Sequence, residues 1–177
     1  MLLHRSYEHE KDLGQLDPLT GVSNSRYFYE RTVIEIEKAM RFNRPLTLAY
    51  FDVDNFKFIN DNYGHNRGDE FLRHIVNIMK SNVRLIDILG RLGGDEFVLL
   101  LPETDEQQAK IVIERIRAEI AKSFDNKEGL AITFSIGVIT CLNTFLPLDE
   151  LIKAADNLMY AAKKASKNTA EYKTYQV

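Results

Sequence analysis

The sequence predicts an α+β fold: a mixed central sheet that contains an antiparallel hairpin and is flanked by helices. Segments with apolar, strand-like patterns alternate with segments whose apolar residues recur every three or four positions, as on one face of a helix. A Gly93-Gly94 pair between two apolar segments interrupts this alternation, as expected for a tight hairpin. The chain has 177 residues, which is enough for one domain and little more. We therefore expect one sheet covered by helices.

Residues 1–16 are predicted to lie outside the domain, which occupies residues 17–177. The first segment mixes charged side chains with a few leucines, a composition typical of a polar helix or of a linker remnant. Turn-forming residues follow at 17–21, where the sequence reads Asp-Pro-Leu-Thr-Gly. We place the start of the domain at that turn.

Three helices and a buried strand are predicted next. A helix from Ser25 to Asn43 ends before Pro45, which cannot continue it. Leu46 to Asp52 is apolar and aromatic and precedes an acidic cluster, so it is predicted to be a buried strand. A short helix from Asn55 to Asn62 is expected to end at Gly64. In the helix that follows, the apolar residues of one face are Leu72, Ile75, Val76, Met79 and Val83.

The second half of the chain is predicted to supply the hairpin and two further strands. Ile88 to Leu92 and Phe97 to Leu101 form the hairpin, which we expect at the centre or the edge of the sheet. Ile132 to Leu142 resumes strand character, and Glu171 to Val177 is a candidate edge strand. Two helical stripes separate these segments, one at Ala109, Val112, Ile113, Ile116 and Ile120, the other at Leu148, Leu151, Ile152, Ala155, Leu158, Met159 and Ala162.

Composition excludes several classes of protein. The chain is 45% hydrophobic and 28% charged, which is typical of a globular protein and not of a disordered one. Its longest apolar run, Phe97 to Leu101, is far shorter than the roughly 20 residues of a membrane span. The single cysteine, Cys141, cannot form an intrachain disulfide, so we expect a core position and a reducing, cytoplasmic location. A net charge of −3 predicts no nucleic-acid polymer as partner, although a local cationic pocket can hold one nucleotide.

The first candidate site lies where the buried strand ends and a helix begins, in the sequence Phe-Asp-Val-Asp-Asn-Phe-Lys at 51–57. Helix N-termini at strand ends suit phosphate groups. Asp52 and Asp54 share a strand face by the period-two rule, and two carboxylates together suit Mg²⁺. Lys57 adds a charge for a terminal phosphate. The alternative is helix capping by Asp54 or Asn55 and a surface lysine.

The second candidate site is the predicted hairpin turn, where Asp95 and Glu96 follow the glycine pair. The glycines permit a tight turn and a close approach of backbone to ligand. In a regular strand the two acids point to opposite faces, so both reach one metal only if the turn breaks the alternation. The alternative is an ordinary glycine hairpin with solvated acids.

Together these motifs resemble the GGDEF domain of diguanylate cyclases over nearly the whole chain except residues 1–16. Gly93 to Phe97 spells the signature itself. The other matching motifs are Asp17 to Gly21 with Asn24, Asp52 to Lys57, Asn60 to His65 with Gly68 to Glu70, Phe134 to Val138, and Ala155-Asp156 with Tyr160 and Lys163. The resemblance implies a palm-like nucleotide cyclase fold and the condensation of two GTP molecules into cyclic di-GMP with release of pyrophosphate.

The resemblance also assigns metal and catalytic positions. Asp52, the backbone carbonyl of Val53, Asp95 and Glu96 match the family's ligands for Mg²⁺, with Mn²⁺ as an alternative. Asp95 matches the position of the general base that deprotonates the attacking 3′-hydroxyl. Divalent ions lower the cost of the charge on the nucleophile and on the leaving group.

Seven positions match substrate contacts of the family. Asn60 and Asp69 match the guanine-reading pair, and Asp69 has the alternative of a helix-start acid. His65 is expected to shape the loop under the nucleotide. The phosphate contacts match Lys57, Lys163, Lys167 and backbone amides near Phe56. Lys167 stands where the family more often has arginine, and Ser166 where glycine is common, so the grip on phosphate is expected to be weaker.

A third feature is the pair Arg84 and Asp87, which is usually a solvated ion bridge worth less than about 1 kcal/mol. In the family this placement resembles the product site that inhibits the enzyme, and Arg115 matches a supporting arginine. The resemblance therefore implies inhibition by cyclic di-GMP.

The resemblance implies a homodimer, because each domain holds one GTP and the product is two-fold symmetric. It also implies an upstream sensory or receiver domain if the chain is a fragment, with dimer formation as the control step. The rival hypothesis is a non-catalytic receptor for cyclic di-GMP or GTP. Relatives of that kind usually lose the signature acids, whereas this chain keeps Asp52, Asp95 and Glu96. A third hypothesis, a pure dimerisation domain, does not require the nucleotide-binding residues.

Overall fold

The computed structural model describes residues 14–124 and 132–176. The predictions for residues 1–13 and for Val177 lie outside the described residues. The helices are α2 (Ser25–Phe42), α3 (Phe56–Tyr63), α4 (His65–Ser81), α5 (Glu106–Phe124) and α6 (Leu148–Ala165). The strands are β1 (Ser23–Asn24), β2 (Leu46–Val53), β3 (Ile88–Gly93), β4 (Glu96–Pro102), β5 (Phe134–Cys141) and β6 (Thr169–Tyr175).

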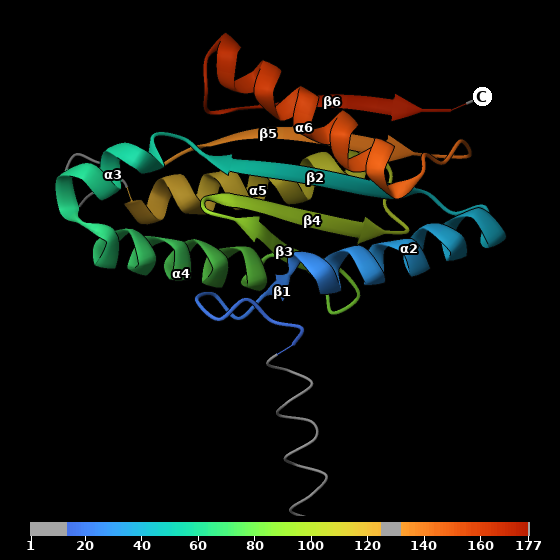
Figure 1. Cartoon of the computed structure of the whole chain (residues 1–177). Helices are drawn as coiled ribbons and strands as arrows, with labels where there is room; N and C mark the ends of the chain where they lie inside the picture. Colours follow the sequence, from blue (N-terminus) through green and yellow to red (C-terminus); the bar gives the residue numbers. More distant parts are fainter. Residues whose placement is uncertain (1–13, 125–131, 177) are drawn as a thin grey trace, which may run out of the picture.

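The strands form one mixed sheet in the order β1-β3-β4-β2-β5-β6. The central strand β2 is antiparallel to both β4 and β5, whereas β1 and β6 pair parallel to β3 and β5 at the two edges. The β3–β4 hairpin lies inside the sheet, and its turn points to the same end as α3 (Figure 1). The predicted α+β fold and the edge position of the last strand are confirmed. The two-residue strand β1 was not predicted.

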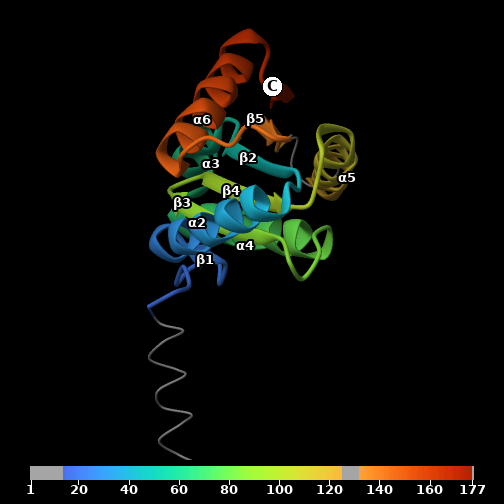
Figure 2. The same cartoon turned by 90° about the vertical axis from the view of Figure 1, so that its right-hand side faces the viewer.

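Helices cover both faces of the sheet, with α2 and α6 on one and α4 and α5 on the other (Figures 1 and 2). All eight residues of β2 are buried, and successive side chains enter different cores. Leu48 and Tyr50 pack with α2 and α6, whereas Phe51 and Val53 pack with α3, α4 and α5. Cys141 is buried as predicted, and burial raises the pKa of its thiol. In the described part of the chain, no helix is long and apolar enough to cross a membrane.

Helix α6 lies directly on β5 because Gly137 has no side chain. A Cβ at Gly137 would lie 2.0 Å from the carbonyl oxygen of Ala155 and 2.4 Å from the amide nitrogen of Met159. Because both neighbours are backbone atoms, they cannot turn aside as a flexible side chain would. This close contact fixes the height of α6 above the sheet, and with it the position of Lys163 near the end of the helix.

Residues 14–16 are joined to the domain by hydrogen bonds, although the sequence interpretation placed them in the N-terminal segment. The amide of Asn24 donates to the carbonyl of Gln15 at 2.8 Å, and its side chain donates to the carbonyl of Gly14 at 3.1 Å. The Asn24 side chain also caps α2 by accepting from the Tyr27 amide. The helix then ends at Asn43, whose φ of 49° is left-handed.

Candidate active site

The two acidic stretches predicted as separate sites meet at one end of the sheet. Asp52, near the end of β2, lies directly opposite Glu96 at the start of β4. On its other side Asp52 lies opposite Ser135 of β5. The amide of Val53 donates to the carbonyl of Asp95 at 3.2 Å, so the backbone of the hairpin turn is bonded to the end of β2.

The hairpin turn is irregular and is held by Arg91. Gly94 has a φ of +50°, and the strand register shifts between Arg91 and Gly93. The extra residue lies on the β3 side of the hairpin, before the glycine pair, so the register shift itself leaves the directions of the Asp95 and Glu96 side chains as a prediction. The Arg91 guanidinium donates to the carbonyl of Gly94 at 2.6 Å and to Asp17 at 3.0 Å. Burial raises the pKa of Asp17, but hydrogen bonds from Thr20 and Arg91 outweigh it and lower that pKa.

The sequence interpretation gave Arg91 and Asp17 no role in the site. The signal was present in the turn motif at 17–21 and in the arginine before the glycine pair. Their contact joins residues 74 positions apart, which no local pattern reveals.

The end of β2 carries excess negative charge. Burial raises the pKa of Asp52, and the neighbouring Asp95 carboxylate adds to the rise. Burial also raises the pKa of Glu96, and the negative charge of Asp52 raises it further. A hydrogen bond from the Tyr50 hydroxyl lowers that pKa but does not cancel the rise. Lys163 Nζ donates to Asp52 Oδ1 at 2.6 Å. Burial lowers the pKa of Lys163, but the bond to Asp52 and the nearby acids raise it overall.

The donor set matches the chemistry of Mg²⁺, because hard carboxylate oxygens with raised pKa values favour a neighbouring cation. Within residues 14–124 and 132–176, however, no three His, Cys, Asp or Glu side chains are gathered as a group that could hold a metal ion. Asp52 is instead paired with the ammonium of Lys163. The acids predicted as metal ligands therefore reach the same end of the sheet without forming a preassembled metal centre.

Asp54 has neither of the two roles considered for it. Its carboxylate accepts hydrogen bonds from Thr133, Ser135 and the Asn168 amide, so its oxygens are already used by the protein. Pairing of Asp54 with Asp52 around a metal was therefore the wrong interpretation. Helix capping was also wrong, because the Asn55 at the N-cap position makes no side-chain cap bond and the Asp54 carboxylate is bonded elsewhere.

The predicted guanine-reading residues lie on two successive helices, Asn60 on α3 and Asp69 on α4. Asn60 Oδ1 is buried and has no hydrogen-bond partner in the described part of the chain. Gly68 lies against it, since a Cβ at Gly68 would come within 2.0 Å of that oxygen. Asp69 follows on α4 and is half-buried. A buried acceptor without a donor costs free energy, so this atom suits a ligand that brings an N–H group.

The predicted phosphate residues surround the start of α3. Lys57 is exposed on the first turn of that helix, whereas the side chain of Phe56 is buried in the core, which leaves its backbone for a ligand. Lys167 Nζ reaches across from the end of α6 to Asn55 Oδ1 at 2.7 Å. His65 is the exposed first residue of α4, and a single residue, Gly64, separates it from α3. Its predicted role beneath the nucleotide stays a prediction.

Comparison with known proteins identifies the family. A sequence model described as "Diguanylate cyclase, GGDEF domain" matches residues 14–169. The chain belongs to the GGDEF family. A relative described as "Probable diguanylate cyclase DgcT" from Escherichia coli (strain K12) is 35% identical over 162 residues, which are 89% of this chain and 35% of that protein. The chain thus spans about a third of that relative's length.

Two solved structures extend the comparison. The diguanylate cyclase SiaD from Pseudomonas aeruginosa, solved in complex with its activator SiaC, is 34% identical with a TM-score of 0.85. The match covers 97% of this chain and 66% of SiaD. A microbial GGDEF domain, described for its interaction with cyclic di-GMP, is 28% identical with a TM-score of 0.82, over 92% of this chain and 99% of that one. The palm-like fold expected from the sequence is confirmed for this GGDEF domain.

Two of the predicted product-site residues of this chain, Arg84 and Asp87, are bonded to each other between α4 and β3, whereas the third, Arg115, is bonded elsewhere. Arg84 Nη2 donates to Asp87 at 2.9 Å and to Thr104 Oγ1 at 2.7 Å. The Asp87 side chain is 1% exposed whereas the Arg84 side chain is 52% exposed, so the ion pair is only partly solvated. Arg115 donates to both the side chain and the carbonyl of Asn82. A hollow of about 590 Å³ lies beside Arg84 and Asp87.

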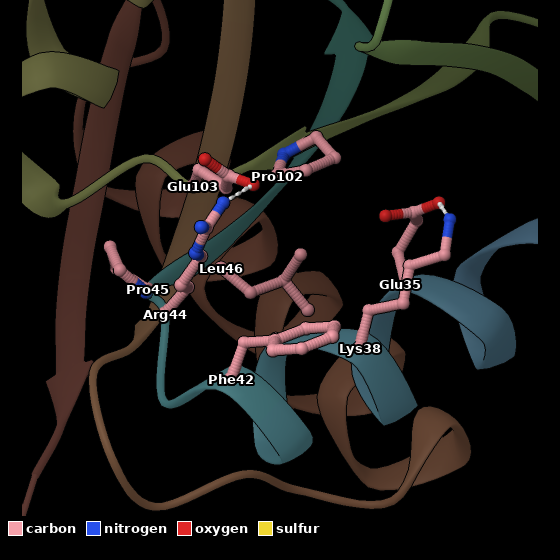
Figure 3. Close-up of a pocket in the computed structure, with 9 residues that line it drawn as sticks. Glu35, Lys38, Phe42, Arg44, Pro45, Leu46, Pro102 and Glu103 are labelled. Atoms are coloured by element: carbon pink, nitrogen blue, oxygen red, sulfur yellow. Dashed lines mark hydrogen bonds and ion pairs between the residues drawn. The ribbon is translucent and has the colours of Figure 1, made fainter.

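A smaller hollow, of about 170 Å³, lies at the opposite end of β2 from the acids (Figure 3). Phe42 and Leu46 line it, and an ion pair between Arg44 and Glu103 closes one side. None of the predicted site residues lines this hollow, so we assign it no part in the active site.

Replacement of Gly68 by alanine is expected to weaken GTP binding with little loss of stability. The new methyl group would displace the flexible Asn60 side chain from the place where we expect guanine to bind. We expect KM for GTP to rise about tenfold, because that factor corresponds to the free energy of roughly one hydrogen bond to the base. The control is Asn66→Ala, an exposed position on the same helix. An unchanged KM in Gly68→Ala would remove Asn60 from the base site.

Proposed function

We propose that this chain is a diguanylate cyclase domain that condenses two GTP molecules into cyclic di-GMP and releases pyrophosphate. The observation that carries the proposal is the meeting of Asp52 and Glu96 across β2 and β4, with Lys163 bonded to Asp52. The buried, unpartnered Asn60 oxygen supports a nucleobase site nearby. The family and its named relatives support the same reaction.

Each group has a task in this reaction. Asp52, the Val53 carbonyl, Asp95 and Glu96 would hold Mg²⁺ or Mn²⁺, which when bound stabilises charge on the attacking and leaving oxygens. Asp95 takes the proton of the 3′-hydroxyl as general base. Asn60 and Asp69 bind the guanine edge. The phosphates are held by Lys57, Lys163, Lys167 and the backbone amides near Phe56.

The active form proposed is a homodimer. One domain binds one GTP, and the two-fold symmetric product requires two sites to face each other. Because the curated relative is about three times longer than the match, we propose that a sensory or receiver domain controls this juxtaposition. A cytoplasmic location suits the GTP substrate.

The direct test is incubation of the purified protein with GTP and Mg²⁺ and chromatographic detection of cyclic di-GMP. We expect product formation, with a rate that rises more steeply than linearly with protein concentration because the dimer is the active species. Removal of Mg²⁺ with EDTA and replacement of GTP by ATP are the controls, and both are expected to stop the reaction. Binding of cyclic di-GMP without any turnover of GTP would instead indicate the receptor function.

Replacement of Arg84 by alanine is expected to relieve product inhibition without lowering the maximal rate. The guanidinium is half-exposed beside the hollow and is held in place by Asp87 and Thr104, so it suits a product phosphate. We expect the inhibition constant for cyclic di-GMP to rise at least about tenfold. Arg44→Ala, which removes an arginine ion pair at the other end of β2, is the matched control. Equal inhibition of the wild type and Arg84→Ala would contradict the product site.

A further inference from the structure

We propose that Asp54 is a positioning residue that fixes Lys167, in the turn after α6, over the phosphate site. Asp54 itself touches neither substrate nor metal in this account. The inference rests on the proposed function, because it concerns how the chain grips the phosphates of GTP.

The Asp54 carboxylate is a buried anchor with three donors. The residue is 1% exposed. Its Oδ1 accepts from Ser135 Oγ at 2.7 Å, and its Oδ2 accepts from Thr133 Oγ1 at 2.7 Å and from the Asn168 amide at 2.9 Å. The Asp54 amide also donates to the Thr133 carbonyl at 2.9 Å. One side chain thus joins the end of β2, the start of β5 and the turn between α6 and β6.

The turn that Asp54 holds is conformationally unfavourable. Lys167 and Asn168 have φ angles of 53° and 47°, two successive non-glycine residues in the left-handed region. Asparagine tolerates this region, but lysine rarely adopts it. Neither of these two positions is a glycine, the residue that adopts a positive φ without strain. Contacts from outside the turn must therefore hold it.

Three contacts in a row join the end of β2 and the residues before α3 to the last turn of α6 and the turn that follows it. Asp52 binds Lys163, Asp54 binds the amide of Asn168, and Asn55 binds Lys167. The contact of Asp54 is the only one of the three that uses a backbone donor of the turn, so it sets where the backbone lies. The two lysine contacts are made by flexible side chains that a bound phosphate can replace.

Arg117 of α5 holds the same turn from the other side, since its guanidinium donates to the carbonyl of Asn168. The turn is therefore clamped between Asp54 and Arg117. Without Asp54 the Asn168 amide loses its acceptor, and the strained backbone is free to relax. The backbone of Lys167 then no longer has a fixed position, which weakens phosphate binding more than it changes the chemical step.

The first test compares Asp54→Ala, Asp54→Asn and Thr133→Val by steady-state kinetics with GTP and Mg²⁺. Asp54→Ala is expected to raise KM about tenfold with a smaller change in kcat, as for loss of a charge-assisted hydrogen bond. The asparagine side chain keeps an oxygen that accepts from the Asn168 amide. We therefore expect the KM of Asp54→Asn for GTP to stay close to the wild-type value. Thr133→Val removes a bond of the same carboxylate on the sheet side, so it is expected to lower thermal stability and leave KM unchanged.

The second test adds Asn168→Gly to Asp54→Ala. Glycine adopts a positive φ without strain. If Asp54 acts through the turn, we therefore expect the double variant to have a KM for GTP close to that of the wild type. If Asp54→Ala does not fold, Asp54→Ser takes its place, because its hydroxyl is too short to reach the Asn168 amide. A folded Asp54→Ala with wild-type KM, or a defect that Asn168→Gly leaves unchanged, overturns the inference alone. A wild-type protein that neither binds GTP in calorimetry nor converts it overturns the inference together with the proposed function.

Discussion

Replacement of Asp95 by alanine is expected to abolish cyclic di-GMP formation while the protein stays folded. The side chain is both the proposed base and one of the proposed metal ligands, so its loss removes two contributions at once. We expect the rate to fall at least about 10³-fold, the range of general acid–base catalysis alone. Folding is expected to persist because the Asp95 atom bonded to β2 is its backbone oxygen, which alanine keeps. The measurement is product formation, with thermal unfolding alongside.

Glu96→Ala is expected to lower the rate of cyclic di-GMP formation by a similar factor. The reason is the loss of a proposed metal ligand alone, because Glu96 is not the proposed base. Glu171→Ala, which removes an exposed acid from the edge strand β6, is the matched control and should keep the wild-type rate. Activity within a few fold of wild type in a folded Asp95→Ala protein would show that the chemistry does not use the hairpin turn.

Replacement of Lys163 by alanine is the second large effect expected. Asp52 is 6% exposed, and the ammonium of Lys163 is its bonded cation. Truncation of Lys163 leaves the buried carboxylate of Asp52 without its cation. It also removes a proposed contact to a phosphate of GTP. We expect kcat/KM for GTP to fall at least about 30-fold. Lys164→Ala is the matched control, because that lysine is the exposed neighbour on α6.

The same variant is expected to change how stability depends on pH. The pKa of Asp52 in the folded protein is already above its ordinary value of 3.8, so the folded state binds this proton more tightly than the unfolded state. Such a group favours folding most at low pH, and this contribution is lost as pH rises through the folded pKa. Loss of Lys163 raises that pKa further. Lys163→Ala should therefore fall further behind the wild-type melting temperature as the pH rises above the ordinary pKa of Asp52, and a pH-independent difference would contradict the pairing.

The fold was predictable where local patterns are long and regular. The buried strand β2, the hairpin around Gly93-Gly94 and the stripes of α4, α5 and α6 all carry clear periods. Strand β1 has only two residues, too few for any period. The start of α4 at His65 was also hidden, because one glycine separates it from α3 and a glycine commonly marks the end of a helix.

The candidate site was predictable by residue type but not by partner. The acids of β2 and the hairpin turn stood out because each carboxylate pair lies at the end of an apolar strand, next to a helix start or a glycine turn. Their actual partners come from far along the chain: Lys163 is 111 positions from Asp52, and Asn168 is 114 positions from Asp54. Such contacts depend on the sheet order and on the height of α6 over β5. No spacing rule along the chain contains that information.

The proposal that the acids of β2 and the hairpin turn bind a divalent ion beside GTP is tested most directly by a crystal structure with a non-reactive GTP analogue and Mn²⁺. The anomalous signal of Mn²⁺ locates the ion. We expect a peak at the end of β2, about 2.1 Å from oxygens of Asp52 and of Asp95 or Glu96, beside the phosphates. We also expect that Lys163 has left Asp52 for a phosphate. A bound analogue whose metal lies away from these carboxylates, with the bond between Lys163 and Asp52 intact, would contradict the proposal.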